Sequence, residues 1–179
     1  AMSAAEAQDY HSLQVDVFAR SETDLISAIT MTNVPEVVGI ARAAKAADKP
    51  SVVSFTVETD GSLPSGQTLG DAITEVDAQT GNTPAYYMIN CAHPDHFVGT
   101  LTPDAPWLSR IRGVRANASR LSHAELVAAE HLDEGNPTEL GQLYIHLASR
   151  IPDLTVVGGC CGTDHRHIHE ICEALNMAA

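Results

Sequence analysis

Apolar residues recur along the chain with two different periods, which predict alternating strands and helices. Short apolar runs rich in β-branched residues predict five strands, at residues 23–32, 51–58, 85–91, 113–119 and 154–160. Apolar residues at helical spacing, with polar caps before them or Gly and Pro after them, predict helices at 4–20, 33–47, 68–79, 104–111, 122–132, 137–149 and 164–176. Because strands and helices alternate, we expect parallel strands covered by helices.

The order of these elements fits two architectures, an open parallel sheet or a piece of an eight-stranded barrel. No G-x-G-x-x-G follows the first expected strand, which weakens the dinucleotide-binding form of the open sheet. The 179 residues contain no internal repeat, low-complexity segment or linker, so we expect one domain over 1–179. In both architectures, reactive side chains gather at the carboxyl ends of the strands.

Composition narrows the classes of partner. The net charge of −13 makes a nucleic-acid backbone or an anionic membrane a poor partner. No apolar stretch is long enough for a membrane span, and the first residues lack the pattern of a signal peptide. We therefore expect a cytoplasmic protein, in which the 4 cysteines serve as metal ligands or reactive thiols rather than as a disulfide framework.

Three of the cysteines stand at the ends of expected strands. Cys91 ends the third strand, and Cys160 and Cys161 end the fifth. Since parallel strands end at one edge, the thiols should converge, and three protein ligands with an open fourth position are typical of catalytic zinc. Neighbouring side chains on a strand point to opposite faces, although Gly158 and Gly159 could let both sulfurs turn inward. A metal site, a vicinal disulfide and two small buried side chains all remain open from spacing alone.

Ordinary structural roles suffice for the candidate residues of the last helix. Cys172 lies on its apolar face, so we expect this thiol in the core with the other members of that face, Ile168, Ile171 and Leu175. Of the histidines near its start, His165 and His169 share a face and His167 points away. We therefore expect these three side chains to form a solvated first turn rather than a metal cluster.

Four residues near the expected strand ends have two interpretations each. His93 and His96 follow the third strand, either as pocket walls and groups that orient metal ligands, or as part of a surface loop. Arg115 and Asn117 alternate on the fourth strand and could face a barrel interior near its rim. For Arg115, a structural ion pair is an equal alternative.

The segments that hold the three cysteines, INCAHPDHF (89–97) and VVGGCCGTDHRHI (156–168), resemble the zinc-ligand motifs of the homocysteine S-methyltransferase family. VSFTVETDGSLPSGQTL (53–69) and GVRANASRLSHAEL (113–126) are similar to its fifth and seventh strand regions. The resemblance covers nearly the whole chain. It implies an α/β fold that is a partial (β/α)8 TIM barrel, in which parallel strands four to eight are present with covering helices and the first three are absent.

The resemblance also implies the chemistry of the site. It assigns Cys91, Cys160 and Cys161 as zinc ligands and places Asn90 in the substrate pocket. A thiol that joins three thiolates on Zn²⁺ is deprotonated near neutral pH and keeps its nucleophilicity. The implied reaction is methyl transfer to homocysteine, giving methionine, from a small donor of the S-methylmethionine, S-adenosylmethionine or betaine class.

One departure from the family pattern leaves alternatives. The family usually has Glu-Thr where this chain has Ile29-Thr30, and that glutamate anchors the substrate ammonium group. The first alternative is a zinc-binding, inactive fragment or subunit, and the second is a thiol-redox or structural protein with a Cys160–Cys161 disulfide. Because a partial set of strands cannot close a barrel, we also expect a homo-oligomer or pairing with a complementary fragment.

Overall fold

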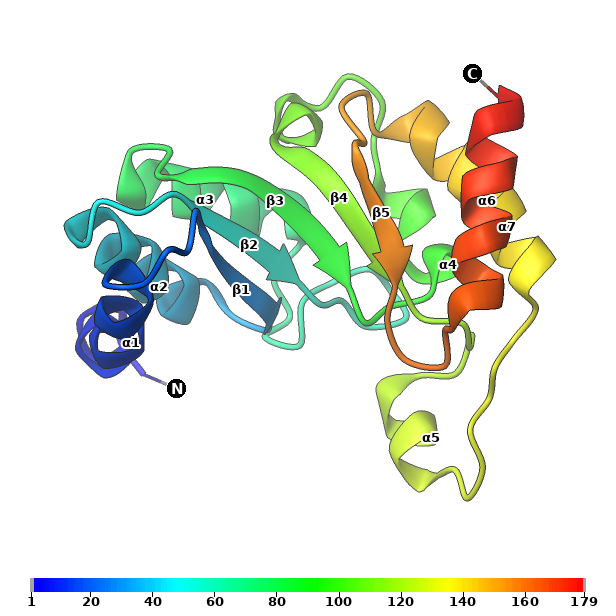
Figure 1. Cartoon of the computed structure of the whole chain (residues 1–179), viewed down its shortest axis with the longest axis horizontal. Helices are drawn as coiled ribbons and strands as arrows, with labels where there is room; N and C mark the ends of the chain where they lie inside the picture. Colours follow the sequence, from blue (N-terminus) through cyan, green and yellow to red (C-terminus); the bar gives the residue numbers. More distant parts are fainter. Residues whose placement is uncertain (1, 179) are drawn as a thin grey trace.

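A five-stranded parallel sheet forms the centre of the structure, a computed structural model that describes residues 2–178 (Figure 1). Its strands follow the order of the chain, β1-β2-β3-β4-β5, with each strand paired to the next in parallel. They comprise β1 (Ile26–Met31), β2 (Ser51–Phe55), β3 (Pro84–Asn90), β4 (Ile111–Ala116) and β5 (Val156–Gly159). The predicted strands and their parallel pairing are confirmed, with ends that differ by a few residues.

Most of the helices lie where the sequence predicts them. The α-helices are α1 (Ala4–Ala19), α2 (Val34–Ala46), α3 (Leu69–Thr80), α4 (Pro94–Phe97), α5 (His123–Ala128), α6 (Pro137–Arg150) and α7 (His165–Ala178). Local chemistry fixes several ends: the Asn33 side chain accepts the Glu36 N–H at the start of α2, and Gly81 ends α3 in the left-handed conformation. No helix among residues 2–178 combines the length and apolar character that crossing a bilayer requires.

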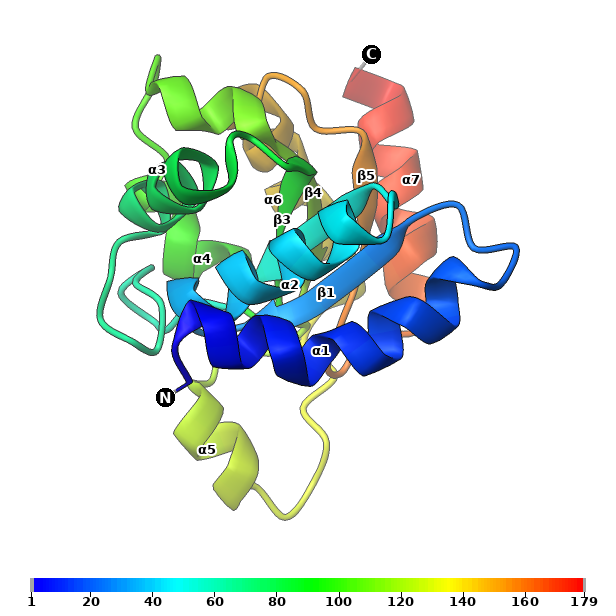
Figure 2. The ribbon, with the colours of Figure 1, turned by 90° about the vertical axis from the view of Figure 1, so that its left-hand side faces the viewer.

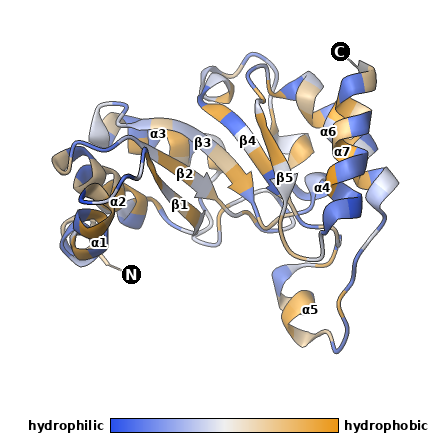
Figure 3. Cartoon of the chain, in the orientation of Figure 1, coloured by the Kyte–Doolittle hydropathy of each residue, from blue (hydrophilic) through white to orange (hydrophobic). Residues whose placement is uncertain are grey.

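Two predicted helices differ from those observed. The helix expected over 104–111 is a single 3₁₀ segment, η2 (Pro106–Arg110), and a second 3₁₀ turn, η1 (Val98–Thr100), follows α4. The helix expected over 122–132 ends at Ala128, because none of the residues of α5 is buried and no packing extends it. The α5 segment therefore projects from the carboxyl end of the sheet (Figures 1 and 3).

The core lies between the sheet and the helices that cover one of its faces. It is built around large, fully buried side chains, among them Phe55, Tyr87, Phe97, Leu140 and Tyr144. Helix α1 packs on α2, as Figure 2 shows, and the contact is close because a Cβ atom at Gly39 would lie 2.6 Å from the Cβ of Ala7. Several apolar residues of α1 stay in solvent, and Tyr10 and Leu13 are 68% and 77% exposed.

The apolar face of α7 differs from the predicted one. Its buried residues are His167, Ile171 and Ala174, whereas Cys172 is exposed and Ile168 is 40% exposed. The prediction that Cys172 lies in the core is therefore wrong. The helix is rotated by about one position relative to the apolar pattern, because the imidazole of His167 is the side chain that faces inward.

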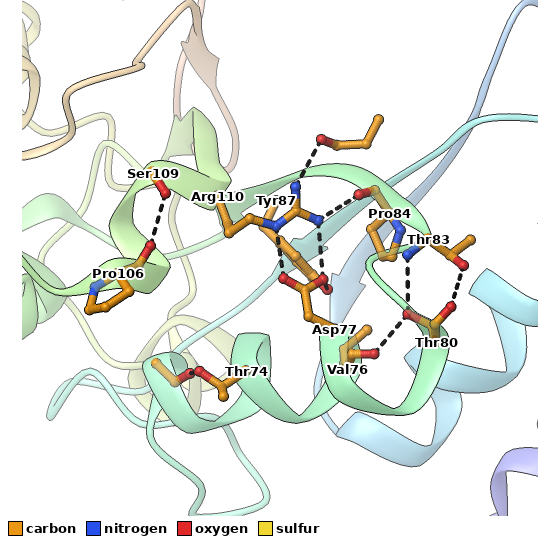
Figure 4. Close-up of polar contacts among 12 residues, drawn as sticks. Thr74, Val76, Asp77, Thr80, Thr83, Pro84, Tyr87, Pro106, Ser109 and Arg110 are labelled. Carbon is orange, nitrogen blue, oxygen red and sulfur yellow. Dashed lines mark hydrogen bonds and ion pairs between the residues drawn. The ribbon is translucent and has the colours of Figure 1, made fainter.

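A polar network ties the amino-terminal ends of β3 and β4 to α3 (Figure 4). Arg110 donates to the Asp77 carboxylate from Nε at 2.8 Å and to the Pro84 carbonyl from Nη2 at 2.6 Å, and the Tyr87 hydroxyl donates to Asp77 at 2.8 Å. Burial, together with this bond to Asp77, raises the pKa of Tyr87. Because the network lies at the end of the sheet opposite to the cysteines, it serves stability rather than the site.

Candidate metal centre

Cys91 follows the last residue of β3, at the point where the chain turns away from the sheet. Its backbone adopts a φ of 55°, a left-handed conformation that costs free energy for a residue with a side chain. Its N–H still donates to the carbonyl oxygen of Arg115 on β4 at 3.2 Å. The turn thus directs the Cys91 thiol out of the strand alternation while the backbone stays attached to the sheet.

Cys160 and Cys161 form a tight turn directly after β5. The Cys160 N–H donates to the Ala116 carbonyl at 2.8 Å, and the Cys160 carbonyl accepts the Thr163 hydroxyl at 2.7 Å. The Cys161 N–H donates to Oδ1 of the buried Asn117 at 3.1 Å. Since these residues lie past the end of the strand, both sulfurs can turn to the same side, as the glycines before them suggested.

The three thiols converge as predicted. The Sγ atom of Cys91 lies 2.7 Å from that of Cys160 and 3.8 Å from that of Cys161, and all three lie within 4.8 Å of one another. They are free cysteines, so the expected alternative of a Cys160–Cys161 disulfide does not occur in this structure. Within residues 2–178 this is the one cluster of three His, Cys, Asp or Glu side chains whose donor atoms could share an ion.

A shared proton makes the cluster acidic. The hydrogen bond from the Cys91 thiol lowers the pKa of Cys160 to about 5. The same hydrogen bond, followed by burial, raises the pKa of Cys91. The pair therefore gives up its first proton more readily than an isolated thiol does, and the resulting thiolate favours metal binding.

The donor set fits zinc in its chemistry and in one of its separations, whereas the Cys91 and Cys160 sulfurs, 2.7 Å apart, would have to move apart by about 1 Å to share the ion. Two ligands at the usual Zn–S distance of about 2.3 Å in a tetrahedron are about 3.8 Å apart, and the Cys91 and Cys161 sulfurs have this separation. Three thiol sulfurs are the soft donors that zinc accepts. Cys161 is exposed while Cys91 and Cys160 are half-buried, so one side of the cluster is open to a further ligand.

Asn90 lies directly before Cys91 and is 1% exposed. Its side-chain oxygen accepts the Ser54 hydroxyl at 2.6 Å and the Thr30 N–H at 3.0 Å, and its amide nitrogen donates to the Thr30 hydroxyl at 2.8 Å. Thr30 has a φ of 63°, so these bonds hold a strained residue at the end of β1. Asn90 thus links three strands beside the cluster, and its contact with a substrate stays a prediction.

The histidines divide differently from the sequence expectation. His165 and His169 are exposed as expected, but His167 is fully buried, so a solvated first turn is wrong for this residue. Its Nε2 bonds the Glu134 carbonyl at 2.8 Å, and its Nδ1 accepts the Asp164 N–H at 3.1 Å. His167 therefore fixes the segment that follows the cysteine turn against the loop after α5.

The structure also decides between the two interpretations given above for His93 and for Arg115. His93 is 2% exposed, so a surface loop is wrong for it, whereas His96 is half-buried and bonds the Arg120 carbonyl. Arg115 is exposed and forms no ion pair within residues 2–178, which removes the structural ion pair as its explanation. Asn117 is buried and holds the cysteine turn.

Sequence reasoning missed His123, a residue that contacts the cluster. Its Nε2 lies 2.7 Å from the Cys91 carbonyl oxygen and its Nδ1 lies 3.4 Å from the Glu58 carboxylate. A capping box between Ser122 and Glu125 starts α5 here, and S-x-x-E before an apolar pair was the available signal. His123 thus anchors the projecting α5 segment to the site.

Protonation of His93 should make stability depend on pH. Burial lowers the pKa of His93 to about 4, and its Nδ1 accepts the Asp95 N–H at 3.3 Å, as a neutral imidazole does. The unfolded chain takes up this proton near pH 6.5 and the folded chain only near 4. The stabilisation is therefore complete above 6.5 and is lost as pH falls towards 4, by about 2–3 kcal/mol. Urea unfolding at a series of pH values measures this loss.

The matched variant is His93→Asn, which keeps a side-chain acceptor for the Asp95 N–H and removes the titration. The difference in unfolding free energy between the two proteins should shrink as pH falls from 6.5 to 4. A difference that stays constant over this range would contradict a buried, neutral His93.

The comparisons agree with this geometry. The sequence model of the family described as homocysteine S-methyltransferase matches residues 1–175. No curated protein sequence matches the chain, whereas 25 chains of solved structures do. One is the apo form of the homocysteine methyltransferase MmuM from Escherichia coli, with a TM-score of 0.66 and 20% sequence identity.

The extent of these matches decides what they establish. The structural match covers 100% of this chain and 59% of MmuM, and at this identity it establishes the fold alone. That fold is α/β with five parallel strands, consistent with part of a TIM barrel. The family match extends over nearly the whole chain and includes all three converging cysteines. The chain belongs to the homocysteine S-methyltransferase family.

Proposed function

We propose that the protein takes part in zinc-dependent transfer of a methyl group to the thiol of homocysteine, giving methionine. The observation that supports this most directly is the convergence of Cys91, Cys160 and Cys161 at the carboxyl edge of the sheet, with one side of the cluster open. The chain spans about three-fifths of the length of MmuM, at 59% coverage. Because the chain matches only this part of MmuM, catalysis by the chain on its own is itself proposed here.

The three cysteines would hold the metal, and the residues around them set their positions. Zinc bound there supplies a positive centre that deprotonates a thiol ligand near neutral pH and leaves its sulfur nucleophilic. Asn117 holds the Cys161 backbone, and His123 lies against the Cys91 carbonyl. These bonds limit the freedom of the ligand-bearing turns, which is the usual role of groups that surround a metal site.

The transfer itself needs an electrophilic methyl group. The homocysteine sulfur attacks the methyl carbon of an onium donor, the new S–C bond forms as the old methyl bond breaks, and the leaving sulfide or amine keeps the electron pair. Donors of the S-methylmethionine, S-adenosylmethionine or betaine class carry a positive charge on the sulfur or nitrogen atom that holds the methyl group. The net charge of −13 and the thiolate cluster favour the approach of such cations.

The edges of the sheet support a proposal about assembly. Within residues 2–178, β1 and β5 are the first and last strands of the sheet, and each pairs on one side only. Unpaired strand edges template further pairing unless they are covered. We therefore propose a homo-oligomer or association with a complementary fragment, in a reducing compartment such as the cytoplasm, where the three thiols stay available.

A second candidate, zinc binding without turnover, has its own support. Ile29 on β1 is 41% exposed, and Thr30 beside it is held in place by Asn90. An apolar side chain at this place offers no anchor to an ammonium group. The second candidate therefore predicts a loaded metal site with no measurable affinity for homocysteine.

One titration separates the two candidates. Homocysteine is titrated calorimetrically into zinc-loaded protein of known mass in solution, in two buffers with different ionisation enthalpies. Binding with release of about one proton per thiol supports the methyltransferase, and methionine formation is then measured with each class of donor. Stoichiometric zinc without any homocysteine binding would reject the first candidate in favour of the second.

A further inference from the structure

Arg115 lies on β4 in the row of residues directly before the cysteines. It is in register with Asn90 of β3 and with Gly158 of β5, and its carbonyl oxygen accepts the Cys91 N–H at 3.2 Å. Adjacent strands are about 4.8 Å apart. The Arg115 side chain therefore starts between the two strands that carry the three thiols.

The side chain of Arg115 extends across β5 on the face that carries Asn90. A Cβ atom at Gly158 would lie 3.7 Å from the Arg115 Cγ and 4.0 Å from its Nε. The lack of a side chain at Gly158 thus leaves the space over which the arginine runs. By strand alternation this face is opposite to Val114, which lies in the core. The side chain therefore runs over Gly158, two residues before Cys160, and stays outside the core.

No partner in the described part of the chain accounts for this charge. The arginine ion pairs there involve Arg110, Arg120 and Arg166, and none involves Arg115. Arg115 is also exposed, and none of the N–H groups of its guanidinium donates to an acceptor within residues 2–178. A guanidinium presents five donors in a planar arrangement that matches a carboxylate.

We infer that Arg115 binds the carboxylate of the thiol substrate, so that the site selects thiols that carry a carboxylate over thiols that lack one. The inference rests on the proposed function, because it needs a thiol bound at the cluster. In homocysteine four bonds separate the sulfur from the carboxyl carbon, a span of about 5 Å. This span is close to the strand spacing, so a sulfur at the cluster leaves the carboxylate within reach of Arg115 for a bidentate pair.

The test compares two thiols on matched proteins. Homocysteine and its decarboxylated analogue, an aminopropanethiol, are titrated calorimetrically into zinc-loaded wild type, Arg115→Gln and Arg112→Gln. Arg112 is a matched control, because it is an exposed arginine of the same strand, three residues and about 10 Å nearer its start. Zinc content and the thermal midpoint of each variant are measured alongside, since both should stay at wild-type values for an exposed side chain.

The expected result is selective. Arg115→Gln should weaken homocysteine binding about 10- to 30-fold and leave the affinity for the decarboxylated thiol unchanged, while Arg112→Gln changes neither. Arg115→Lys should recover part of the loss, because it restores the charge without the planar arrangement of donors.

Two different failures can be told apart. Equal affinities of the wild type for the two thiols, or equal losses for both in Arg115→Gln, would overturn the inference and leave the proposed function intact. Failure of the zinc-loaded wild type to bind either thiol would overturn the proposed function and the inference together.

Discussion

Replacing Cys160 by serine is expected to reduce the bound zinc from about one ion per chain to near zero and to abolish homocysteine binding. The pKa of Cys160 is lowered, because the Cys91 thiol donates a hydrogen bond to it. A serine hydroxyl does not ionise at neutral pH, so the variant would offer two sulfurs and a neutral oxygen. Zinc content after dialysis against a weak chelator measures the first effect, and calorimetry measures the second.

The chain contains its own control for this experiment. Cys172 is an exposed cysteine on α7, outside the cluster, so Cys172→Ser should bind zinc and homocysteine as the wild type does. Cys91→Ser should behave as Cys160→Ser does, because both sulfurs belong to the same donor set. Full zinc content in both cluster variants would show that the metal binds elsewhere.

The parallel sheet and the cysteine cluster were within reach of sequence reasoning because both depend on simple rules. Apolar runs alternating with helical patterns require parallel strands, and strands that run in parallel end at a common edge. Cys91 and the Cys160–Cys161 pair, 69 residues away along the chain, could be brought together on that argument alone. Caps at Asn33 and Gly81 are equally local and equally predictable.

The residues that were misjudged depend on rotations and side-chain partners that a pattern does not contain. The apolar residues of α7 suggested Cys172 as a core residue, but the helix turns His167 inward because this imidazole finds the Glu134 carbonyl and the Asp164 N–H. A buried histidine satisfied by two backbone groups has no periodic signature. The contact between His123 and the Cys91 carbonyl likewise needs the three-dimensional position of α5.

Asn90 and Arg115 mark a further limit. The sequence places both near the cluster, but only the structure separates an amide whose oxygen is occupied by Ser54 and Thr30 from a guanidinium that has no partner in residues 2–178. This distinction changes which residue is the better candidate for a substrate contact. Availability of hydrogen-bonding groups, rather than proximity to the metal ligands, decides it.

Gly162→Ala is expected to destabilise the protein by about 3 kcal/mol and to weaken zinc binding. Gly162 follows the two cysteines and has a φ of 79°, and a Cβ atom there would lie 2.5 Å from the Asp133 carbonyl oxygen. Asp133 cannot easily move away, because its carboxylate accepts bonds from Ser119 and from the Gly135 N–H. The clash should therefore displace the turn that carries Cys160 and Cys161. Urea unfolding and zinc affinity measure the two effects.

Gly66→Ala separates the clash from the backbone strain. Gly66 also has a positive φ, of 85°, but no atom lies within 4 Å of the place where its Cβ would be. Its substitution should cost about 1 kcal/mol, the penalty for the left-handed conformation alone, and should leave zinc affinity unchanged. The excess loss in Gly162→Ala then measures the contact with Asp133. Equal losses in the two variants, with equal zinc affinities, would mean that the loop after α5 yields and does not hold the cysteine turn in place.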